Sequence, residues 1–263
     1  MISFAFGKGQ DTRRRGCVRP ADWSRLAARH GAPLFARAIE WRRTCGMVGP
    51  RATGPVFDDA FRAQLLELFR WRRDVRRFRP TPVPPGLLDR LLDAASLAPS
   101  VGLSEPWRMV TVDDPARRAA VRASFEACNA QALAGQAAGR AAAYARLKLA
   151  GFDEAPCQFA VFAEPDPGQG HGLGRATMPE TTAYSAVMAV HTLWLAARAF
   201  GMGLGWVSIL DPAAVAEALD VSPGWTFIGY FCLGYPQSED EAPELERLGW
   251  EQRRPARSTI IRR

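Results

Sequence analysis

The sequence has few of the residues that build metal or disulfide sites. Its 263 residues include only 5 cysteines and 3 histidines. The cysteine count is odd and no two cysteines stand at C-x-x-C spacing, while the histidines form no ligand pattern. These absences exclude a disulfide framework and a zinc site, and they predict reduced thiols and no metal centre.

Long apolar runs are also missing. No uninterrupted apolar stretch is long enough to span a bilayer, and no apolar segment follows Arg13-Arg14-Arg15, as a secretory signal would require. We therefore expect a cytoplasmic protein with no membrane partner. The hydrophobic content of 48% is that of an ordinary globular chain that buries a core.

The positive charge is confined to one end of the chain. Residues 1–56 carry eleven Lys and Arg against three acidic residues, a net of +8, so residues 57–263 carry −1 of the total +7. A nucleic-acid-binding domain carries its basic patch on the folded body, so we expect no nucleic-acid partner. We interpret residues 1–56 as a poorly ordered basic extension and residues 57–263 as the folded domain. Met47 is an alternative start, since the regular pattern begins about ten residues after it.

Apolar periodicity predicts more helices than strands. Thr177 to Glu180 resembles a capping box that would start the helix over 177–201. Because the strands do not alternate regularly with helices, the pattern favours an α+β fold. The other expected helices cover residues 57–71, 86–97, 114–128, 130–149 and 211–219, and the expected strands cover 107–112, 157–163, 204–210 and 225–233.

Three segments suggest one phosphorylated planar ligand. Arg72, Arg73 and Arg76 surround Asp74, and guanidinium groups bind phosphate through a planar fork. A solvated charge run with a weak local salt bridge is the alternative. The loop 98–107 contains small hydroxyl residues and a glycine that allow a ligand to approach the backbone. The glycines of 201–205 follow a helix and precede a strand, which is not the dinucleotide-binding order, but they leave room for a flat ring on the strand.

The first two of these segments resemble motifs of the nitroreductase-like flavoprotein superfamily. They are Arg72 to Phe78 and Ala98 to Trp107, with Asp74 in place of the usual Ser. That replacement is similar to the BluB family of 5,6-dimethylbenzimidazole synthases, whose usual Gln is replaced here by Glu105. The likeness covers Phe57 to Arg253 and includes further motifs at 170–175, 177–181, 205–212 and 243–250.

The resemblance implies a nitroreductase-like α+β fold, with a central, mostly antiparallel sheet flanked by helices. It implies a homodimer that holds FMN between its subunits. It also implies an enzyme that consumes reduced FMN with O2 and releases 5,6-dimethylbenzimidazole, the lower ligand of cobalamin (vitamin B12), and D-erythrose 4-phosphate. FMN is then a substrate, and NAD(P)H or a partner flavin reductase is the implied source of its reduced form.

The resemblance further implies residue roles. Asp74 matches a general base or proton shuttle, and Ser208 matches a hydrogen-bond donor near the flavin ring. These two are the expected catalytic residues, and no residue is assigned to a metal. The expected FMN contacts are Arg72, Arg73, Asp74, Val75, Arg76, Ser100, Leu103, Val207, Ser208 and, through the phosphate, Arg247.

Two other functions stay open at this point. A conventional NAD(P)H-dependent nitroreductase or flavin reductase would bind FMN and leave it intact, and Asp74 in place of Ser argues against it. A non-enzymatic flavin-binding or redox-sensing module is the third hypothesis. The near-neutral body and the pair of Asp74 and Ser208 argue against that module.

Overall fold

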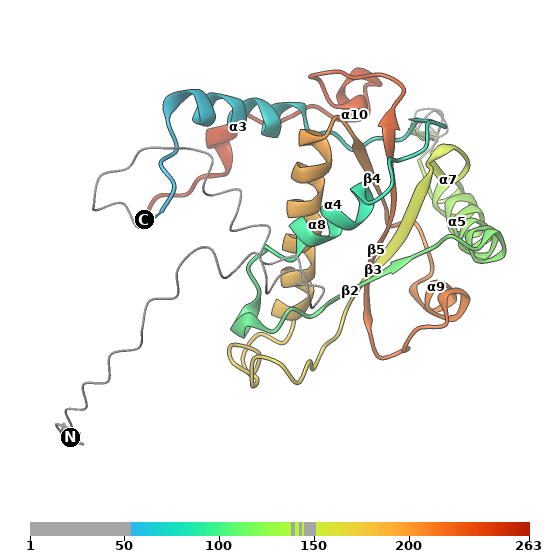
Figure 1. Ribbon diagram of the computed structural model, residues 1–263. Coiled ribbons are helices and arrows are strands. Elements are labelled where there is room, and N and C mark those ends of the chain that lie inside the picture. Colours follow the sequence, from blue (N-terminus) through green and yellow to red (C-terminus); the bar gives the residue numbers. More distant parts are fainter. Residues whose placement is uncertain (1–53, 138–139, 142–143, 145–150) are drawn as a thin grey trace, which may run out of the picture. The chain divides into compact units, whose positions relative to one another are not determined.

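The structure, a computed structural model, describes residues 54–137, 140–141, 144 and 151–263 (Figure 1). The basic extension, the alternative start at Met47 and part of the helix expected over 130–149 lie outside the described residues. Contacts divide the chain after Phe57, and Asp58–Arg263 forms a unit with its own core. In this described part, no helix is long and apolar enough to cross a membrane.

A five-stranded sheet forms the centre of this unit. Its strands are β1 (Phe78–Arg79), β2 (Trp107–Thr111), β3 (Cys157–Ala163), β4 (Gly203–Val207) and β5 (Thr226–Pro236). The long β5 pairs with β3 on one side and with β4 and then β1 on the other, and β2 pairs with β3. Every one of these pairs is antiparallel, so the expected mostly antiparallel sheet is confirmed.

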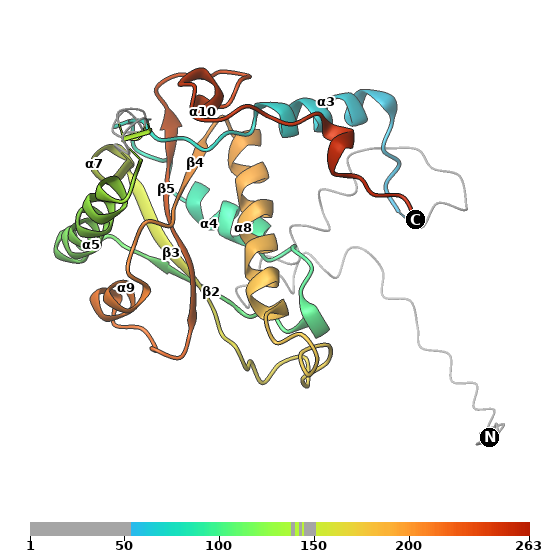
Figure 2. The same cartoon turned by 180° about the vertical axis from the view of Figure 1, so that it is seen from behind.

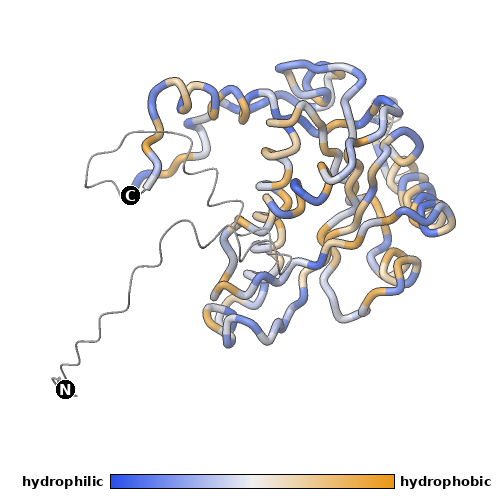
Figure 3. The backbone as a smooth tube through the Cα atoms, viewed as in Figure 1, coloured by the Kyte–Doolittle hydropathy of each residue, from blue (hydrophilic) through white to orange (hydrophobic). Residues whose placement is uncertain are grey.

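Helices cover both faces of the sheet, as Figures 1 and 2 show. One face packs against α4 (Leu87–Ala95) and α8 (Thr181–Ala199), and the other against α5 (Pro115–Ala134), α7 (Gly151–Glu154) and α9 (Pro212–Leu219). Two apolar cores result, one on each face, and the central strands are mostly hydrophobic in Figure 3. The predicted α+β class is therefore confirmed.

Local capping signals account for several helix starts. The Asp114 carboxylate accepts a hydrogen bond from the Ala116 amide at 2.8 Å, and the Asp211 carboxylate accepts one from the Ala213 amide at 2.8 Å. Each Asp precedes a Pro, which suits the first helical position because its missing N–H is not needed there. The expected starts of α5 and α9 are thus confirmed.

The capping box expected at Thr177 is wrong. The helix begins four residues later, at Thr181, after a turn. The Thr181 hydroxyl donates to the Met178 carbonyl at 2.7 Å and the Thr182 hydroxyl donates to the Pro179 carbonyl at 3.2 Å. Pro179 explains why the helix does not start at Thr177, because the proline ring disfavours helical backbone at the preceding residue, Met178.

Other bounds also differ from expectation. Helix α5 runs without a break to Ala134, where two helices were expected, and β4 ends at Val207 rather than at residue 210. The two-residue β1 was not expected. Strand β3 has the predicted bounds. Helix α3 (Asp59–Trp71) is capped by Asp58, whose carboxylate accepts a hydrogen bond from the Phe61 amide at 2.8 Å. A 3-10 turn, η3 (Val101–Leu103), lies in the loop before β2, and α10 (Glu244–Arg247) and η4 (Ala256–Thr259) follow β5.

The chain after α3 lies directly against β4. The Val75 amide donates to the Leu204 carbonyl at 3.0 Å, and Asp74 forms a parallel bridge with Leu204. A Cβ at Gly203 would lie 2.9 Å from Val75 Cβ, and one at Gly205 would overlap the Val75 carbonyl oxygen. These two glycines therefore admit the protein's own chain. The interpretation that they make room for a flat ring is corrected accordingly.

Gly205→Ala is expected to destabilise the fold by about 1–3 kcal/mol, because the added methyl overlaps a backbone atom that cannot rotate away. Urea unfolding followed by circular dichroism measures this difference. The matched control is Gly168→Ala, where no atom lies within 4 Å of the added Cβ. Equal unfolding free energies for the two variants would contradict the close approach of Val75 to β4.

Candidate functional site

Asp74 is held by groups from two segments. Its Oδ1 accepts a hydrogen bond from the Trp206 amide of β4 at 2.9 Å. Its Oδ2 accepts one from Arg76 Nε at 3.4 Å. The side chain of Asp74 is 38% exposed and that of Arg76 is 16% exposed. The carboxylate is therefore fixed from the protein side and open on the other.

The surroundings of Asp74 favour its neutral form. Burial raises the pKa of the Asp74 carboxyl above its ordinary value, and the charge of Glu244 adds to the rise. The Trp206 amide and Arg76 act in the opposite direction, since both stabilise the ionised carboxylate. A carboxylate whose pKa lies above its usual range is a stronger proton acceptor once ionised.

Trp194 of α8 contacts the two residues before Asp74 and also Trp206. Its indole N–H donates to the Arg73 carbonyl at 3.1 Å, and the Arg72 guanidinium lies 5.0 Å from the ring centroid. The ring also contacts Trp206, with centroids 6.4 Å apart. Trp194 is only 9% exposed, so it is a fixed support for the arginine segment.

Arg72 and Arg73 lie near a third arginine, Arg253, from the C-terminal segment. Burial lowers the pKa of both guanidinium groups, and the charge of Arg253 lowers it further. The charge of Asp74 raises the pKa of Arg72, and the charges of Glu241 and Asp240 raise that of Arg73, so acidic neighbours offset part of this repulsion. Sequence reasoning missed Arg253, although the basic pair Arg253-Arg254 at the end of the family-like region was a usable signal.

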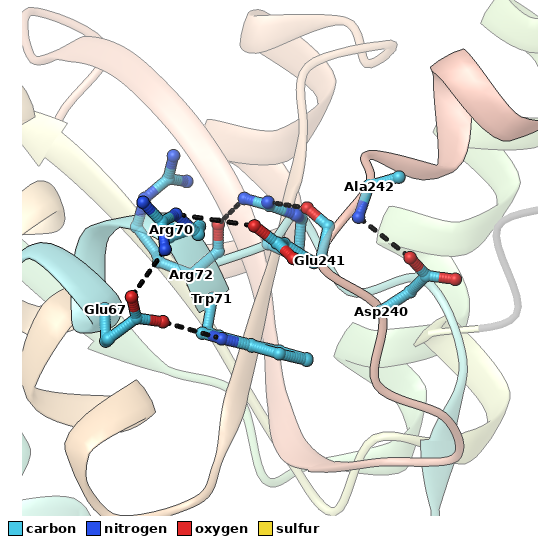
Figure 4. Close-up of polar contacts among 8 residues, drawn as sticks. Glu67, Arg70, Trp71, Arg72, Asp240, Glu241 and Ala242 are labelled. Carbon is cyan, nitrogen blue, oxygen red and sulfur yellow. Dashed lines mark hydrogen bonds and ion pairs between the residues drawn. The ribbon is translucent and has the colours of Figure 1, made fainter.

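Arg73 also binds the loop after β5. Its Nη1 donates to the Arg72 carbonyl at 2.8 Å and its Nη2 donates to the Glu241 carbonyl. Its Nε is buried without a hydrogen-bond partner among the described residues. Figure 4 shows neighbouring contacts, in which Arg70 Nε lies 3.4 Å from a Glu241 carboxylate oxygen and Trp71 donates to Glu67 at 3.2 Å.

A small cavity of about 30 Å³ opens beside Arg73. It lies between the ends of α3 and α8, the start of β4 and the loop after β5. Its walls include Trp71, Trp194 and Met202, together with Arg198, which Glu239 binds through both carboxylate oxygens at 2.7 and 2.9 Å. The cavity therefore shares Arg73 and Trp194 with the arginine cluster.

Val207 is the last residue of β4, and Ser208 directly follows it. The Val207 side chain is 2% exposed and belongs to one of the two cores, so only its backbone is available to a ligand. Ser208 is exposed and follows Trp206 by two residues, roughly 7 Å along an extended chain. The structure thus brings Ser208 to the strand that holds Asp74.

Arg247 has a different partner from the other arginines described above. It is on α10, where its Nε pairs with an Asp240 carboxylate oxygen at 3.2 Å. The side chain is 44% exposed. Its expected phosphate contact therefore competes with an existing ion pair.

Ser100 and Leu103 lie at the other end of α8. The Val101 amide donates to the Ser185 hydroxyl at 3.0 Å, which places this loop near the start of the helix. Trp194 is nine residues further along, roughly 13 Å by helix geometry. Leu103 is 71% exposed, and Ser100 Oγ accepts the Glu105 amide at 3.1 Å. Within one chain, the structure does not bring this loop to the arginine segment.

The chain and its fold match a known family. The nitroreductase family matches residues 69–235. A solved structure of iodotyrosine deiodinase bound to FMN and 3-iodo-L-tyrosine has the same fold, with a TM-score of 0.59 and 22% identity over 75% of this chain and 97% of that one. The chain therefore belongs to the nitroreductase family.

Within that family, the chain shares high sequence identity with two bacterial relatives. It is 58% identical to a 5,6-dimethylbenzimidazole synthase of Rhodospirillum rubrum over 211 residues, which is 80% of this chain and 99% of that protein. It is 51% identical to a 5,6-dimethylbenzimidazole synthase of Rhodobacter capsulatus, over 76% of this chain and 96% of that protein. The expected resemblance is confirmed.

Asp74→Asn is expected to remove the contribution of Asp74 to the pH dependence of the unfolding free energy. Because the folded-state pKa of Asp74 is raised, the folded protein holds this proton more tightly than the unfolded chain. Its contribution is therefore favourable at low pH and declines as the pH rises from about 4. The unfolding free energy of the unmodified protein, relative to Asp74→Asn, should fall between pH 4 and pH 7.

Urea unfolding at several pH values measures this difference. Asp59→Asn is the control, because the Asp59 side chain is 96% exposed. A difference that rises with pH in the Asp74 pair would show that the hydrogen bonds to the ionised carboxylate outweigh its burial.

Proposed function

We infer that this protein is a 5,6-dimethylbenzimidazole synthase that fragments reduced FMN with O2 into 5,6-dimethylbenzimidazole and D-erythrose 4-phosphate. The observation that carries this function is the 58% identity to the Rhodospirillum rubrum synthase over nearly its whole length. The placement of Asp74 supports it, since a conventional nitroreductase that leaves FMN intact needs no carboxylate there.

The residues present fit FMN. Arg72, Arg73 and Arg253 gather three positive charges whose mutual repulsion a phosphate dianion would relieve. Arg72 and Arg73 are fixed by contacts to Trp194 and to the Glu241 carbonyl, so little ordering is needed on binding. We assign the FMN phosphate to these three arginines, with the Val75 and Val207 backbones beside the ring.

Asp74 and Ser208 are the proposed catalytic residues. When bound, reduced FMN supplies the electrons for O2 and the atoms of the product. The Asp74 carboxylate, held by the Trp206 amide, accepts a proton on its open side. Ser208 is exposed and lies two residues after Trp206, and its hydroxyl donates a hydrogen bond to the flavin ring.

A second copy of the chain is proposed to complete the site. The arginine segment and the loop with Ser100 and Leu103 lie near opposite ends of α8 in one chain. The outward side of α8 carries Tyr184 and Met188, which are 54% and 43% exposed. Helix α3 has no buried side chain, and its Leu66 is 61% exposed. Such apolar surface on two neighbouring helices suits a homodimer interface.

The source of reduced FMN is proposed to be a separate flavin reductase that uses NAD(P)H. The reaction is placed in the cytoplasm, and the free thiols of Cys128, Cys157 and Cys232 agree with a reducing compartment.

Purified protein supplied with FMN, NADH, a flavin reductase and air is expected to form 5,6-dimethylbenzimidazole in step with the loss of flavin. Liquid chromatography with mass detection measures both. Asp74→Asn should bind FMN, because the three arginines remain, but its rate should fall by at least about a hundredfold, the usual contribution of a general base. Intact FMN after this incubation would refute the proposed function, and NADH consumption by the protein with FMN but without the added flavin reductase would identify a conventional reductase.

Co-expression of Arg72→Ala with Leu103→Asp tests the shared site. If each site takes Arg72 from one subunit and Leu103 from the other, random mixing makes half of the dimers mixed, and each mixed dimer has one intact site. About a quarter of the normal product yield should return. Arg72→Ala with Asp74→Asn is the matched control and should restore nothing, since both changes lie in the same half-site. No recovery in the first pair would place the whole site within one chain.

A further inference from the structure

We propose that the glycine-rich loop, residues 168–175, positions the flavin loop, residues 98–107, for flavin binding. The positioning residues are Gln169 and Gly170, which hold the backbone around Leu103 in a conformation that few residues adopt. This inference rests on the proposed function, in which the flavin loop contacts FMN. It adds two residues to the site through the loop that they hold.

The flavin loop has an unusual backbone. The φ angles of Gly102, Leu103 and Glu105 are +58°, +55° and +43°. Left-handed backbone is ordinary for glycine, but in other residues it brings the Cβ atom too close to the following carbonyl oxygen. Leu103 and Glu105 therefore form an unfavourable conformation that contacts from outside the loop must maintain. Segments of this kind cluster at functional sites.

The glycine-rich loop supplies such contacts. Gln169 Nε2 donates a hydrogen bond to the Leu103 carbonyl at 2.6 Å. A Cβ at Gly170 would lie 2.7 Å from the Gly102 carbonyl oxygen and 3.0 Å from Ser104 Cβ, so only glycine allows this approach. The two loops lie side by side in Figures 1 and 2, the flavin loop before β2 and the glycine-rich loop before α8.

These contacts act on the inner side of the flavin loop. Ser104 lies against Gly170 and is only 3% exposed. The Val101 amide donates to the Ser185 hydroxyl of α8, which fixes the loop from a second direction. The Leu103 side chain, by contrast, is mostly exposed. The loop therefore presents Leu103 outward, as its proposed contact with a flavin requires.

The glycine-rich loop has an anchor of its own after the end of β3. Arg175 Nη2 donates to the Pro167 carbonyl at 3.1 Å, and Arg175 Nη1 donates to the Pro165 carbonyl at 3.3 Å. The same Nη1 lies 2.8 Å from an Asp166 carboxylate oxygen, and the Arg175 side chain is only 12% exposed. The two ends of this loop are thus joined by contacts that do not involve the flavin loop.

Loss of this support should change binding more than chemistry. If the flavin loop leaves its conformation in part of the molecules, the observed dissociation constant of FMN rises by the inverse of the fraction that stays competent. Once FMN is bound the loop is in place, and the proposed chemistry belongs to Asp74 and Ser208. The KM for reduced FMN should therefore rise while kcat stays nearly unchanged.

Gly170→Ala tests the close approach of the two loops. The added methyl would overlap the Gly102 carbonyl oxygen, so the FMN dissociation constant, from quenching of flavin fluorescence, should rise by at least about tenfold. The kcat at saturating reduced FMN should stay within about twofold of normal. Gly172→Ala is the matched control, because φ is +74° there and +82° at Gly170, but the nearest atom to its added Cβ is Arg175 Nη2 at 3.8 Å. It shares the left-handed backbone without the overlap, and its FMN dissociation constant should stay within about twofold of normal.

Gln169→Ala tests the hydrogen bond to the Leu103 carbonyl. Because Gln169 is exposed, the packing should remain intact, and the FMN dissociation constant should rise about fivefold, the value of one net hydrogen bond. The Leu103 and Ser104 amides donate to the Ser100 and Val101 carbonyls at 3.1 and 3.0 Å. In the FMN-free protein these amides should exchange hydrogen about fivefold faster in the variant, measured by mass spectrometry.

Three results would overturn the inference. Equal FMN binding by Gly170→Ala and Gly172→Ala would show that the approach of the two loops has no effect on the site. Unchanged exchange in Gln169→Ala would show that this side chain does not hold the flavin loop. Faster exchange with unchanged FMN binding would show that the shape of the loop does not control binding. Should Gly170→Ala fail to fold by circular dichroism, Gln169→Ala decides.

Binding and exchange need no turnover, so they separate this inference from the proposed function. Faster exchange and weaker FMN binding in Gln169→Ala support the inference even if the unmodified protein makes no 5,6-dimethylbenzimidazole, and in that case the proposed function alone fails. If the unmodified protein forms the product while Gln169→Ala binds FMN normally, the inference alone fails.

Discussion

The hydrogen bond from the Trp206 amide to the Asp74 carboxylate joins the site to the sheet. It exists because the chain after α3 lies close against β4, with the Val75 amide bound to the Leu204 carbonyl at 3.0 Å. That approach in turn needs glycine at 203 and 205, since a Cβ at either place would meet Val75. The Asp74 carboxylate is therefore positioned by backbone contacts, which are less free to rearrange than side-chain contacts.

The contact between this segment and β4 gives the arginines on either side of it different partners. Trp194 binds the Arg73 carbonyl and lies against the Arg72 guanidinium. Arg76, beyond the bridge to β4, faces Asp74 instead. Arginines of one short segment thus have different partners, because the path of the backbone directs them to different neighbours.

Helix α8 relates the site to the proposed dimer. Its inner side fills one core with Ala186, Val190 and Leu193, and its ends support the arginine segment and the loop with Ser100. A single helix therefore sets the spacing between two groups of proposed flavin contacts that one chain does not bring together. Symmetric pairing of two chains is a simple way to bring such halves into one site.

The sequence by itself determined the features that depend on near neighbours along the chain. The Asp-Pro starts of α5 and α9 and the apolar run of β3 formed as expected, because each needs only contacts within a few residues or burial of a continuous apolar strand. Motif order indicated the family and made Asp74 the informative residue. Only the tertiary structure decided the partners of the arginines: it joined Arg73 to the Glu241 carbonyl, 168 residues further along the chain, and the Trp194 ring to Arg72. Groups so far apart in sequence become neighbours only when whole helices and strands pack together. A local sequence pattern therefore does not predict such contacts.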